Sequence, residues 1–218
     1  MNGFDIHAAM AVLRQEAINW QTPAVTIVSQ REGNPFKVLI SCLLSLRTQD
    51  STTGPASERL FALAATPEKM MLLSRDEIER AIYPVGFYRN KASQISEICH
   101  RLVEHYDGMV PDEIEPLLEL KGVGRKTANL VVTLGFGKPG ICVDTHVHRI
   151  CNRWGYIATR TPEQTEMALR KCLPQEYWIE INDLLVAFGQ NICRPLSPYC
   201  TKCRLADICK RCGVTRFR

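Results

Sequence analysis

Long hydrophobic runs are missing from this sequence. The longest, LVVTLGF, contains Thr133 and Gly135 and falls well short of the roughly 18 consecutive apolar residues that a membrane-spanning helix needs. A basic leader is missing too, because Asp5 stands among the first residues and the apolar residues after it have an amphipathic spacing. We therefore expect no signal peptide, no contact with a membrane and a cytoplasmic location.

Strand patterns are almost absent. Alternation of apolar and polar residues is confined to AVTIVSQ at 24–30, and we find no internal repeat and no low-complexity segment. Apolar residues instead recur at i, i+3 and i+4 in the segments 35–46, 75–82, 91–106, 114–120, 126–136, 145–155, 162–173 and 180–193. Turn signals such as Gly54-Pro55 and the KPG break at 138–140 separate them. The sequence predicts an all-α protein with a domain junction at the KPG break.

Acidic residues are scarce at the C-terminal end. From Cys193 to Arg218 one acid, Asp207, stands against seven bases, so this segment carries a charge of +6 in a chain whose formal charge is +4. A basic segment on a nearly neutral body favours an anionic partner on one face. A solvated tail explains the same charges equally well. The remaining composition, 45% hydrophobic and 23% charged, is that of a globular protein with a sizeable core.

Ten cysteines fall into two groups. Five are scattered among apolar or helical residues, as buried free thiols usually are: Cys42, Cys99, Cys142, Cys151 and Cys172. The others have the spacing Cys193-x6-Cys200-x2-Cys203-x5-Cys209, with Cys212 three residues further on. Disulfides are rare in a reducing compartment, so a metal site is the better interpretation. One Cys-x2-Cys between single flanking cysteines favours an iron–sulfur cluster, and zinc, which usually takes two such pairs, is the alternative.

Two glycines enclose a single valine in LELKGVGRKTANL at 118–130. A helix ending in LLEL meets Gly122, which can take φ > 0, and a new helix begins after Gly124. We expect a helical hairpin in which the N–H groups of Val123, Gly124 and Arg125 bind a phosphate at the positive end of the new helix. Such a contact carries no base information. A plain turn between two helices accounts for the pattern equally well.

Lys126 and Asp144 are the candidate reactive side chains. Lys126 stands in the first helical turn, where a cation is disfavoured, so it is either a nucleophilic amine or a point-charge contact to phosphate. Asp144 follows the apolar ICV and precedes a helix, which indicates an N-cap and does not exclude a role in stabilising a developing cation. His146 and His148 lie two residues apart and face different sides of a helix, so we expect no metal ligand there.

Three motifs, LKGVGRKTAN, VDTHVHRICNR and C-x6-C-x2-C-x5-C, occur in this order between about Asn34 and Cys209. Together they resemble the endonuclease III family, the iron–sulfur, helix-hairpin-helix branch of the DNA glycosylases. The resemblance implies a two-domain all-α fold: a six-helix barrel at 28–138, and a discontinuous cluster domain at 1–27 and 139–218. It also implies action on double-stranded DNA with damaged bases or abasic sites. We expect a monomer, because the motifs form one complete site, and a cytoplasmic protein that is associated with the nucleoid if it is bacterial.

The resemblance assigns roles to individual residues. It implies a Schiff-base lysine at Lys126, an assisting aspartate at Asp144, and removal of a flipped-out oxidised pyrimidine followed by β-elimination. The implied ligands of a [4Fe-4S] cluster are Cys193, Cys200, Cys203 and Cys209, which leaves Cys212 as a non-ligand. The implied DNA contacts are Gly122, Val123, Gly124, Arg125, Arg47, Gln49, Phe87 and Arg89.

Two positions depart from the family pattern. Arg47 stands where a glutamine usually fills the gap left by the flipped base, and Gln49 is a substitute for it two residues on. Phe87 stands where the wedge is often leucine, and an aromatic ring stacks well into a base step. These departures leave a mismatch or uracil/thymine DNA glycosylase open as an alternative. A non-catalytic iron–sulfur DNA-binding module is the other alternative, although it would need neither Lys126 nor Asp144.

Overall fold

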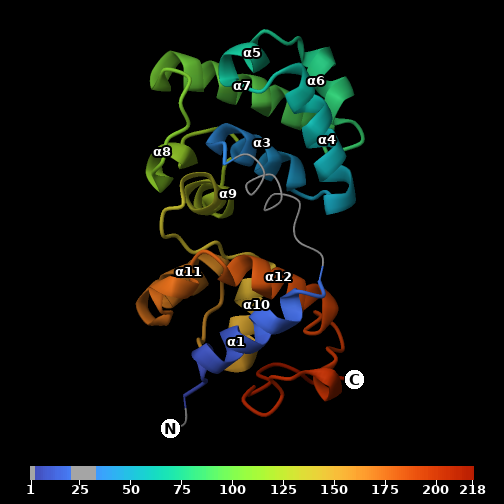
Figure 1. Ribbon diagram of the computed structural model, residues 1–218, viewed down its shortest axis with the longest axis vertical. Coiled ribbons are helices and arrows are strands. Elements are labelled where there is room, and N and C mark those ends of the chain that lie inside the picture. Colours follow the sequence, from blue (N-terminus) through green and yellow to red (C-terminus); the bar gives the residue numbers. More distant parts are fainter. Residues whose placement is uncertain (1–2, 21–32) are drawn as a thin grey trace. The chain divides into compact units, whose positions relative to one another are not determined.

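The computed structural model describes residues 3–20 and 33–218. The chain divides into two compact units. We call Pro23–Gly140 the continuous unit, and Met1–Thr22 together with Ile141–Arg218 the split unit (Figure 1). The described residues form helices and no strand, which confirms the all-α prediction, while the candidate strand at 24–30 lies outside them. The domain limits expected from the sequence, at 28 and 138, stay a prediction.

The continuous unit is built around α3 (Pro35–Ser45), which buries eight of its 11 residues. Asn34 caps this helix by accepting from the backbone N–H groups of Phe36 and Lys37. α3 packs against α4 (Asp50–Leu63), α7 (Tyr88–Tyr106), α9 (Arg125–Leu130) and the π-helical turn η1 (Val131–Gly135). Further contacts come from α5 (Pro67–Met71) and α6 (Arg75–Ile82) on α7, and from α8 (Ile114–Leu118) on α9.

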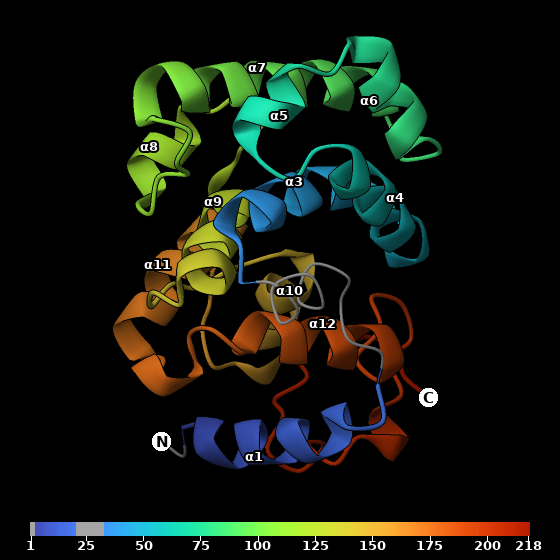
Figure 2. The ribbon, with the colours of Figure 1, turned by 45° about the horizontal axis from the view of Figure 1, so that its top comes forward.

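The split unit joins one N-terminal helix to the C-terminal third of the chain. Its elements are α1 (Ile6–Ala17), α10 (Thr145–Trp154), α11 (Pro162–Cys172), η2 (Gln175–Tyr177), α12 (Ile181–Asn191) and η3 (Cys200–Lys202). α12 packs against both α1 and α10 (Figure 2). Met10, Leu13, Trp154 and Phe188 are fully buried at their contact, so the two chain segments share one hydrophobic core.

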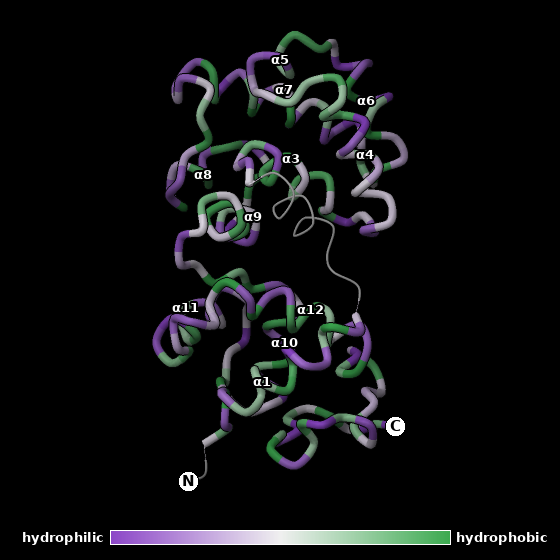
Figure 3. The backbone as a smooth tube through the Cα atoms, viewed as in Figure 1, coloured by the Kyte–Doolittle hydropathy of each residue, from purple (hydrophilic) through white to green (hydrophobic). Residues whose placement is uncertain are grey.

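Amphipathic spacing accounts for most of these helices. Hydrophilic and hydrophobic residues alternate along them in both units, as expected when one face of each helix is buried (Figure 3). In the described part of the chain, no helix is both long and apolar enough to cross a membrane.

The turn predicted at Gly54-Pro55 is wrong. Both residues lie inside α4, whose buried face includes Thr53, Ala56 and Leu60. Pro55 stands in the second turn of α4, where a proline removes one backbone hydrogen bond and costs about 3 kcal/mol. Packing of the apolar face of α4 on α3 therefore outweighs the local turn signal.

Candidate active site and cysteine pocket

The glycine hairpin connects α8 to α9 in the continuous unit. Gly122 has φ +82°, as the sequence predicted, whereas Gly124 is the N-cap of α9 with extended backbone at φ −97° and ψ 175°. One part of the prediction is wrong: the N–H of Val123 donates to the carbonyl of Leu120 at 3.0 Å, so it is engaged within the hairpin. Val123 is also buried and holds the turn against the core.

Lys126 is exposed in the first turn of α9. The residues that follow it, Thr127 to Leu130, are all buried, so the helix is fixed in the core and its first turn faces solvent. Burial raises the pKa of the nearby Cys42 thiol to about 12, and the positive charge of Lys126 acts against that rise. The buried residues of α9 therefore hold the exposed Lys126 side chain at a fixed place on the surface of this unit.

Asp144 is the N-cap of α10 in the split unit. Its Oδ1 accepts from the backbone N–H of His146 at 2.7 Å and of Val147 at 2.9 Å, so the predicted capping role is confirmed. Two bonds to one oxygen hold the carboxylate in one orientation. Lys126 and Asp144 thus belong to different units, and each is positioned by its own helix start.

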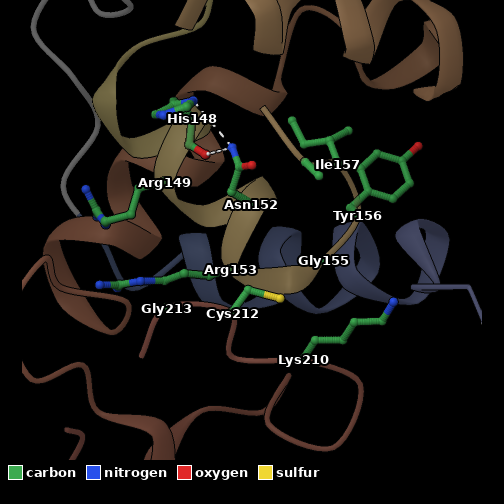
Figure 4. Close-up of a pocket in the computed structure, with 11 residues that line it drawn as sticks. His148, Arg149, Asn152, Arg153, Gly155, Tyr156, Ile157, Lys210, Cys212 and Gly213 are labelled. Carbon is green, nitrogen blue, oxygen red and sulfur yellow. Dashed lines mark hydrogen bonds between the residues drawn. The ribbon is translucent and has the colours of Figure 1, made fainter. Parts of the chain in front are cut away.

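The two histidines of α10 make separate contacts. His148 Nδ1 lies 2.7 Å from Thr165 Oγ1, and His146 Nδ1 lies 3.1 Å from a guanidinium nitrogen of Arg149. Figure 4 shows a pocket beside this helix, lined among others by His148, Lys210 and Cys212. Cys212 therefore faces a different pocket from the other C-terminal cysteines.

Four cysteines line one cavity in the split unit. Cys193, Cys200, Cys203 and Cys209 share it with apolar walls that include Trp154, Phe188 and Ile192. Among residues 3–20 and 33–218, no three His, Cys, Asp or Glu side chains form a group that could hold a single metal ion. The two observations agree if the occupant is larger than one ion, because a cube of iron and sulfur spreads its four ligands around its corners.

The surroundings of these sulfurs suit thiolates. Arg153 donates to Cys193 Sγ at 3.4 Å, and the backbone N–H of Arg211 donates to Cys209 Sγ at 3.3 Å. Burial raises the pKa of Cys203 to about 11 and also raises that of Cys209, so bare thiolates are costly in the cavity. A bound metal deprotonates its thiol ligands and offsets this cost. The donor set therefore fits an iron–sulfur cluster.

Basic groups gather around Tyr199, which lies on the segment between the first two of these cysteines. The guanidinium carbons of Arg194 and Arg218 each lie 5.1 Å from the centre of the Tyr199 ring, and Lys202 Nζ lies 5.9 Å from it. Arg153 holds the same segment by donating to the carbonyls of Arg194 at 2.7 Å and Pro195 at 2.6 Å. The +6 segment is therefore an ordered surface, as an anionic partner requires.

The predicted gap-filling residue Arg47 and the predicted wedge Phe87 lie together in the continuous unit. The Arg47 guanidinium carbon is 5.6 Å from the centre of the Phe87 ring, and the Phe87 side chain is 60% exposed. Gln49, the N-cap of α4, is exposed in the same segment as Arg47. Arg89, in the first turn of α7, lies 4.0 Å from a carboxylate oxygen of Glu79 and over the Tyr88 ring.

Two positioning residues were missed by reasoning from the sequence. Lys91 lies on the buried face of α7, four residues before Ile95, and its amine contacts the Arg47 segment. Arg153 lies on α10 and holds the Cys193 segment. A signal existed for Lys91, since a lysine in the apolar stripe of a helix is unusual and needs an internal partner. None existed for Arg153, whose partners lie 40 to 42 residues away.

An all-α chain with a glycine hairpin ahead of an exposed lysine, and a capping aspartate on the following helix, has the fold and site of the helix-hairpin-helix DNA glycosylases. A model of the HhH-GPD superfamily of base excision DNA repair proteins matches residues 40–175. Endonuclease III of Thermotoga maritima is 50% identical over 182 residues, covering 84% of this chain and 85% of that protein. Endonuclease III of Escherichia coli is 37% identical over 178 residues, covering 82% and 84%.

Solved structures give the same result. A non-covalent endonuclease III–DNA complex superposes with a TM-score of 0.82 at 33% identity, over 94% of each chain. A trapped endonuclease III–DNA covalent intermediate superposes with a TM-score of 0.76 at 38% identity. The chain belongs to the endonuclease III family within the HhH-GPD superfamily.

Proposed function

We propose that this protein removes oxidised pyrimidines from duplex DNA with Lys126 as the nucleophile. The wider activity follows from the family: the protein is a DNA glycosylase and AP lyase of base excision repair, and it binds damaged double-stranded DNA. The observation that carries the residue assignment is the exposed Lys126 directly after the Gly122–Gly124 hairpin. A monomer in the cytoplasm, expected from the sequence, stays a prediction.

The chemistry assigned to Lys126 is a substitution followed by an elimination. The neutral amine attacks C1′ of a flipped-out nucleotide, and the damaged base leaves with the bonding electrons of the glycosidic bond. Ring opening then gives an imine between Nζ and C1′, which acidifies the C2′ proton. Loss of that proton expels the 3′ phosphate and cuts the strand on the 3′ side of the lesion. Water releases the lysine from the imine.

Asp144 has a supporting role in this scheme. Its carboxylate is oriented by two backbone N–H groups and stabilises the positive charge that develops on the sugar as the base leaves. It also takes part in the proton transfers that open the sugar ring. Because the same carboxylate caps α10, part of its value to the protein is structural.

We further propose that Cys193, Cys200, Cys203 and Cys209 hold a [4Fe-4S] cluster. The common cavity and the donors to Cys193 and Cys209 support this assignment. The bound cluster would cross-link the loop from Cys193 to Cys209, and it would take no part in breaking a bond. Residues of the loop, Arg194 and Lys202, then face DNA phosphates.

The remaining contacts bind and open the duplex. Gly124 and Arg125, at the start of α9, hold a phosphate, while Gly122 and Val123 shape the turn that presents them. Arg47, Gln49 and Phe87 fill the space left by the flipped nucleotide, and Arg89 contacts a phosphate. Arg47 in place of the usual glutamine keeps a mismatch or uracil/thymine glycosylase as a second candidate.

Borohydride trapping tests the assignment. Wild type and Lys126→Ala are incubated with duplexes that carry an abasic site, thymine glycol, uracil or a G·T mismatch. We expect covalent complexes on the abasic and thymine glycol duplexes, absent in the variant because no other amine is at C1′. Complexes on uracil or G·T but not on thymine glycol would favour the second candidate. DNA binding without any trapping would contradict the lyase mechanism and favour a binding module.

Asp144→Asn serves as the matched control. Asparagine caps a helix about as well as aspartate, so the variant should melt within a few degrees of wild type. It lacks the negative charge, so base release should slow by about 100-fold or more. Asp144→Ala loses both functions and should also melt lower. Equal activity of the asparagine variant and wild type would show that Asp144 is only a cap.

A further inference from the structure

Lys91 is a buried lysine whose amine is fully bonded. The residue is 5% exposed, and its Nζ donates to the carbonyls of Leu44 at 2.9 Å and Leu46 at 2.5 Å, and to Thr48 Oγ1 at 3.2 Å. An ammonium has three donors, so each has an acceptor. Two of the three acceptors, Leu46 and Thr48, lie in the segment between α3 and α4, which contains Arg47, and the third, Leu44, lies in the last turn of α3.

The amine completes the C-terminal end of α3. The last four carbonyls of a helix have no intrahelical partner, and here all four are bonded. The carbonyls of Cys42, Leu43 and Ser45 accept from groups of the same segment, and that of Leu44 accepts from Lys91. The positive charge also suits the negative end of the helix dipole. α7 thus supplies the group that fixes where α3 ends and the Arg47 segment begins.

The Thr48 hydroxyl connects this segment to the loop that carries Phe87. Its oxygen accepts from Lys91 Nζ and, at 3.1 Å, from the backbone N–H of Gly86, and it donates to the carbonyl of Leu46 at 3.3 Å. The two backbones touch: a Cβ at Gly86 would lie 2.7 Å from the carbonyl oxygen of Arg47. The segment and the loop therefore form one unit joined through Thr48 and Lys91.

Both predicted wedge residues have a strained backbone. Arg47 has φ +54° and Phe87 has φ +58°, a region that is strained for a residue other than glycine. Arg47 and Phe87 are neighbours in space, one in each of two loops. Contacts with surrounding groups are needed to keep both backbones in this conformation. The bonds from Lys91 and Thr48 provide that restraint, and the side chains then meet with the guanidinium over the ring.

We propose that Lys91, acting with Thr48, is a positioning residue that locks the Arg47 segment and the Phe87 loop into a single two-pronged wedge for opening the duplex. This inference rests on the proposed function, since a wedge has a purpose only in a protein that flips a nucleotide. A purely stabilising role does not account for Lys91. Burial lowers its pKa to about 8, so the charged form is costly at this position.

The test separates duplex opening from chemistry. Lys91→Met keeps the side-chain length and removes the amine, and Thr48→Val keeps the shape and removes the hydroxyl. Ile98→Ala, two turns further along α7, is the control for loss of stability alone. Each variant is mixed with a thymine glycol duplex that carries 2-aminopurine opposite the lesion, and the fluorescence rise reports unstacking of that base. Cleavage of an abasic site in single-stranded DNA reports the lysine chemistry without a wedge.

We expect Lys91→Met and Thr48→Val to lose most of the fluorescence rise and to excise thymine glycol from duplex about tenfold more slowly. Their cleavage of single-stranded abasic DNA should stay within about twofold of wild type, as should both activities of Ile98→Ala once it is assayed below its melting temperature. The double variant Phe87→Ala/Lys91→Met should open DNA no worse than Phe87→Ala, because both changes remove the same wedge.

A full fluorescence rise in Thr48→Val or Lys91→Met overturns the inference, as does an equal loss on duplex and single-stranded substrates. If Lys91→Met fails to fold, Thr48→Val decides alone, since it leaves the amine its two carbonyl acceptors. Failure of the proposed function gives a different result from failure of the inference about Lys91. In that case wild type cleaves neither substrate, and the fluorescence rise and its loss in the variants are still measured.

Discussion

Gly122 and Gly124 show how one residue type serves two purposes within three positions. Gly122 has φ +82°, a conformation that favours glycine, whereas a Cβ there would meet only the movable end of the Gln94 side chain, so the backbone of the turn is what calls for glycine. Gly124 has an ordinary backbone conformation, and a Cβ there would meet nothing within 4 Å. The fold therefore does not explain Gly124, whereas close approach of a phosphate to the backbone does.

Alanine at each glycine separates these two reasons. Gly124→Ala should melt within a few degrees of wild type, because the loss in capping is offset by the lower entropy of the unfolded chain. Its affinity for abasic duplex should fall about tenfold, because the Cβ holds the phosphate away from the N–H groups. Gly122→Ala should melt clearly lower. Thermal melts measure the stability of each variant, and fluorescence anisotropy measures its affinity for abasic duplex. Unchanged affinity of Gly124→Ala would show that the hairpin does not contact DNA.

The candidate reactive residues could be located from the sequence because their signals are local. Lys126 and Asp144 each follow a helix-start pattern that can be recognised within a few residues. The use of the Val123 N–H was not accessible, since it depends on a bond back to Leu120 that closes the turn. The position of Lys91 in the apolar stripe of α7 indicated a buried partner, but the identity of its acceptors was not accessible, because they lie 43 to 47 residues away.

At the scale of elements, helices with clear caps were predicted best. α6 begins and ends where the sequence predicts, at 75 and 82, because Ser74 and Glu77 form a capping box at its start. α4 was missed because Gly54 and Pro55 indicate a turn, and only its contact with α3 reveals why the helix continues. Periodicity therefore predicts helices whose local signals agree, and tertiary packing decides the others.

The capping box of α6 makes stability depend on pH. Bonds from the Ser74 hydroxyl, and then from the Ser74 N–H, hold the pKa of Glu77 below its usual 4.5. A carboxylate with a lowered pKa stabilises the folded state above its usual pKa, and this contribution is lost as the pH falls through the lowered value. Ser74→Ala should therefore lower the melting temperature by a few degrees at pH 7.

The pH profile is the decisive part of that experiment. The difference between wild type and Ser74→Ala should shrink as the pH falls from 4.5 through the lowered pKa of Glu77, because below that value Glu77 is protonated in both proteins. Thermal melts of the two proteins across this range measure it. If the difference in melting temperature between the two proteins stays constant down to the lowest pH measured, the Ser74 hydroxyl caps the helix without help from Glu77.

At the scale of the whole molecule, the proposed cluster is a structural cross-link of the split unit. Oxidative removal of iron should release the loop that carries Arg194 and Lys202, and affinity for DNA should fall about tenfold with a shallower dependence on salt. Borohydride trapping at saturating enzyme should persist, because Lys126 lies in the continuous unit. Loss of trapping while DNA is still bound would instead give the cluster a part in the chemistry.

Two serine variants provide the matched comparison for this prediction. Cys203→Ser removes a proposed ligand, so the purified protein should contain little iron and bind DNA weakly. Cys212→Ser changes a cysteine that faces the other pocket, and its iron content and visible absorption should equal those of wild type. Equal iron in both variants would contradict the ligand assignment.

The split unit also has a consequence for how the protein is made. α1 is bonded across the fold, with Arg14 paired to Glu180 at a separation of 166 residues. A ribosome therefore releases α1, with its apolar face, long before α12 exists to cover it, and the whole continuous unit emerges in between. The four cysteines follow α12 in the chain, so the proposed cluster can form only after the helices of the split unit have been made. Until then a newly made chain needs protection at α1.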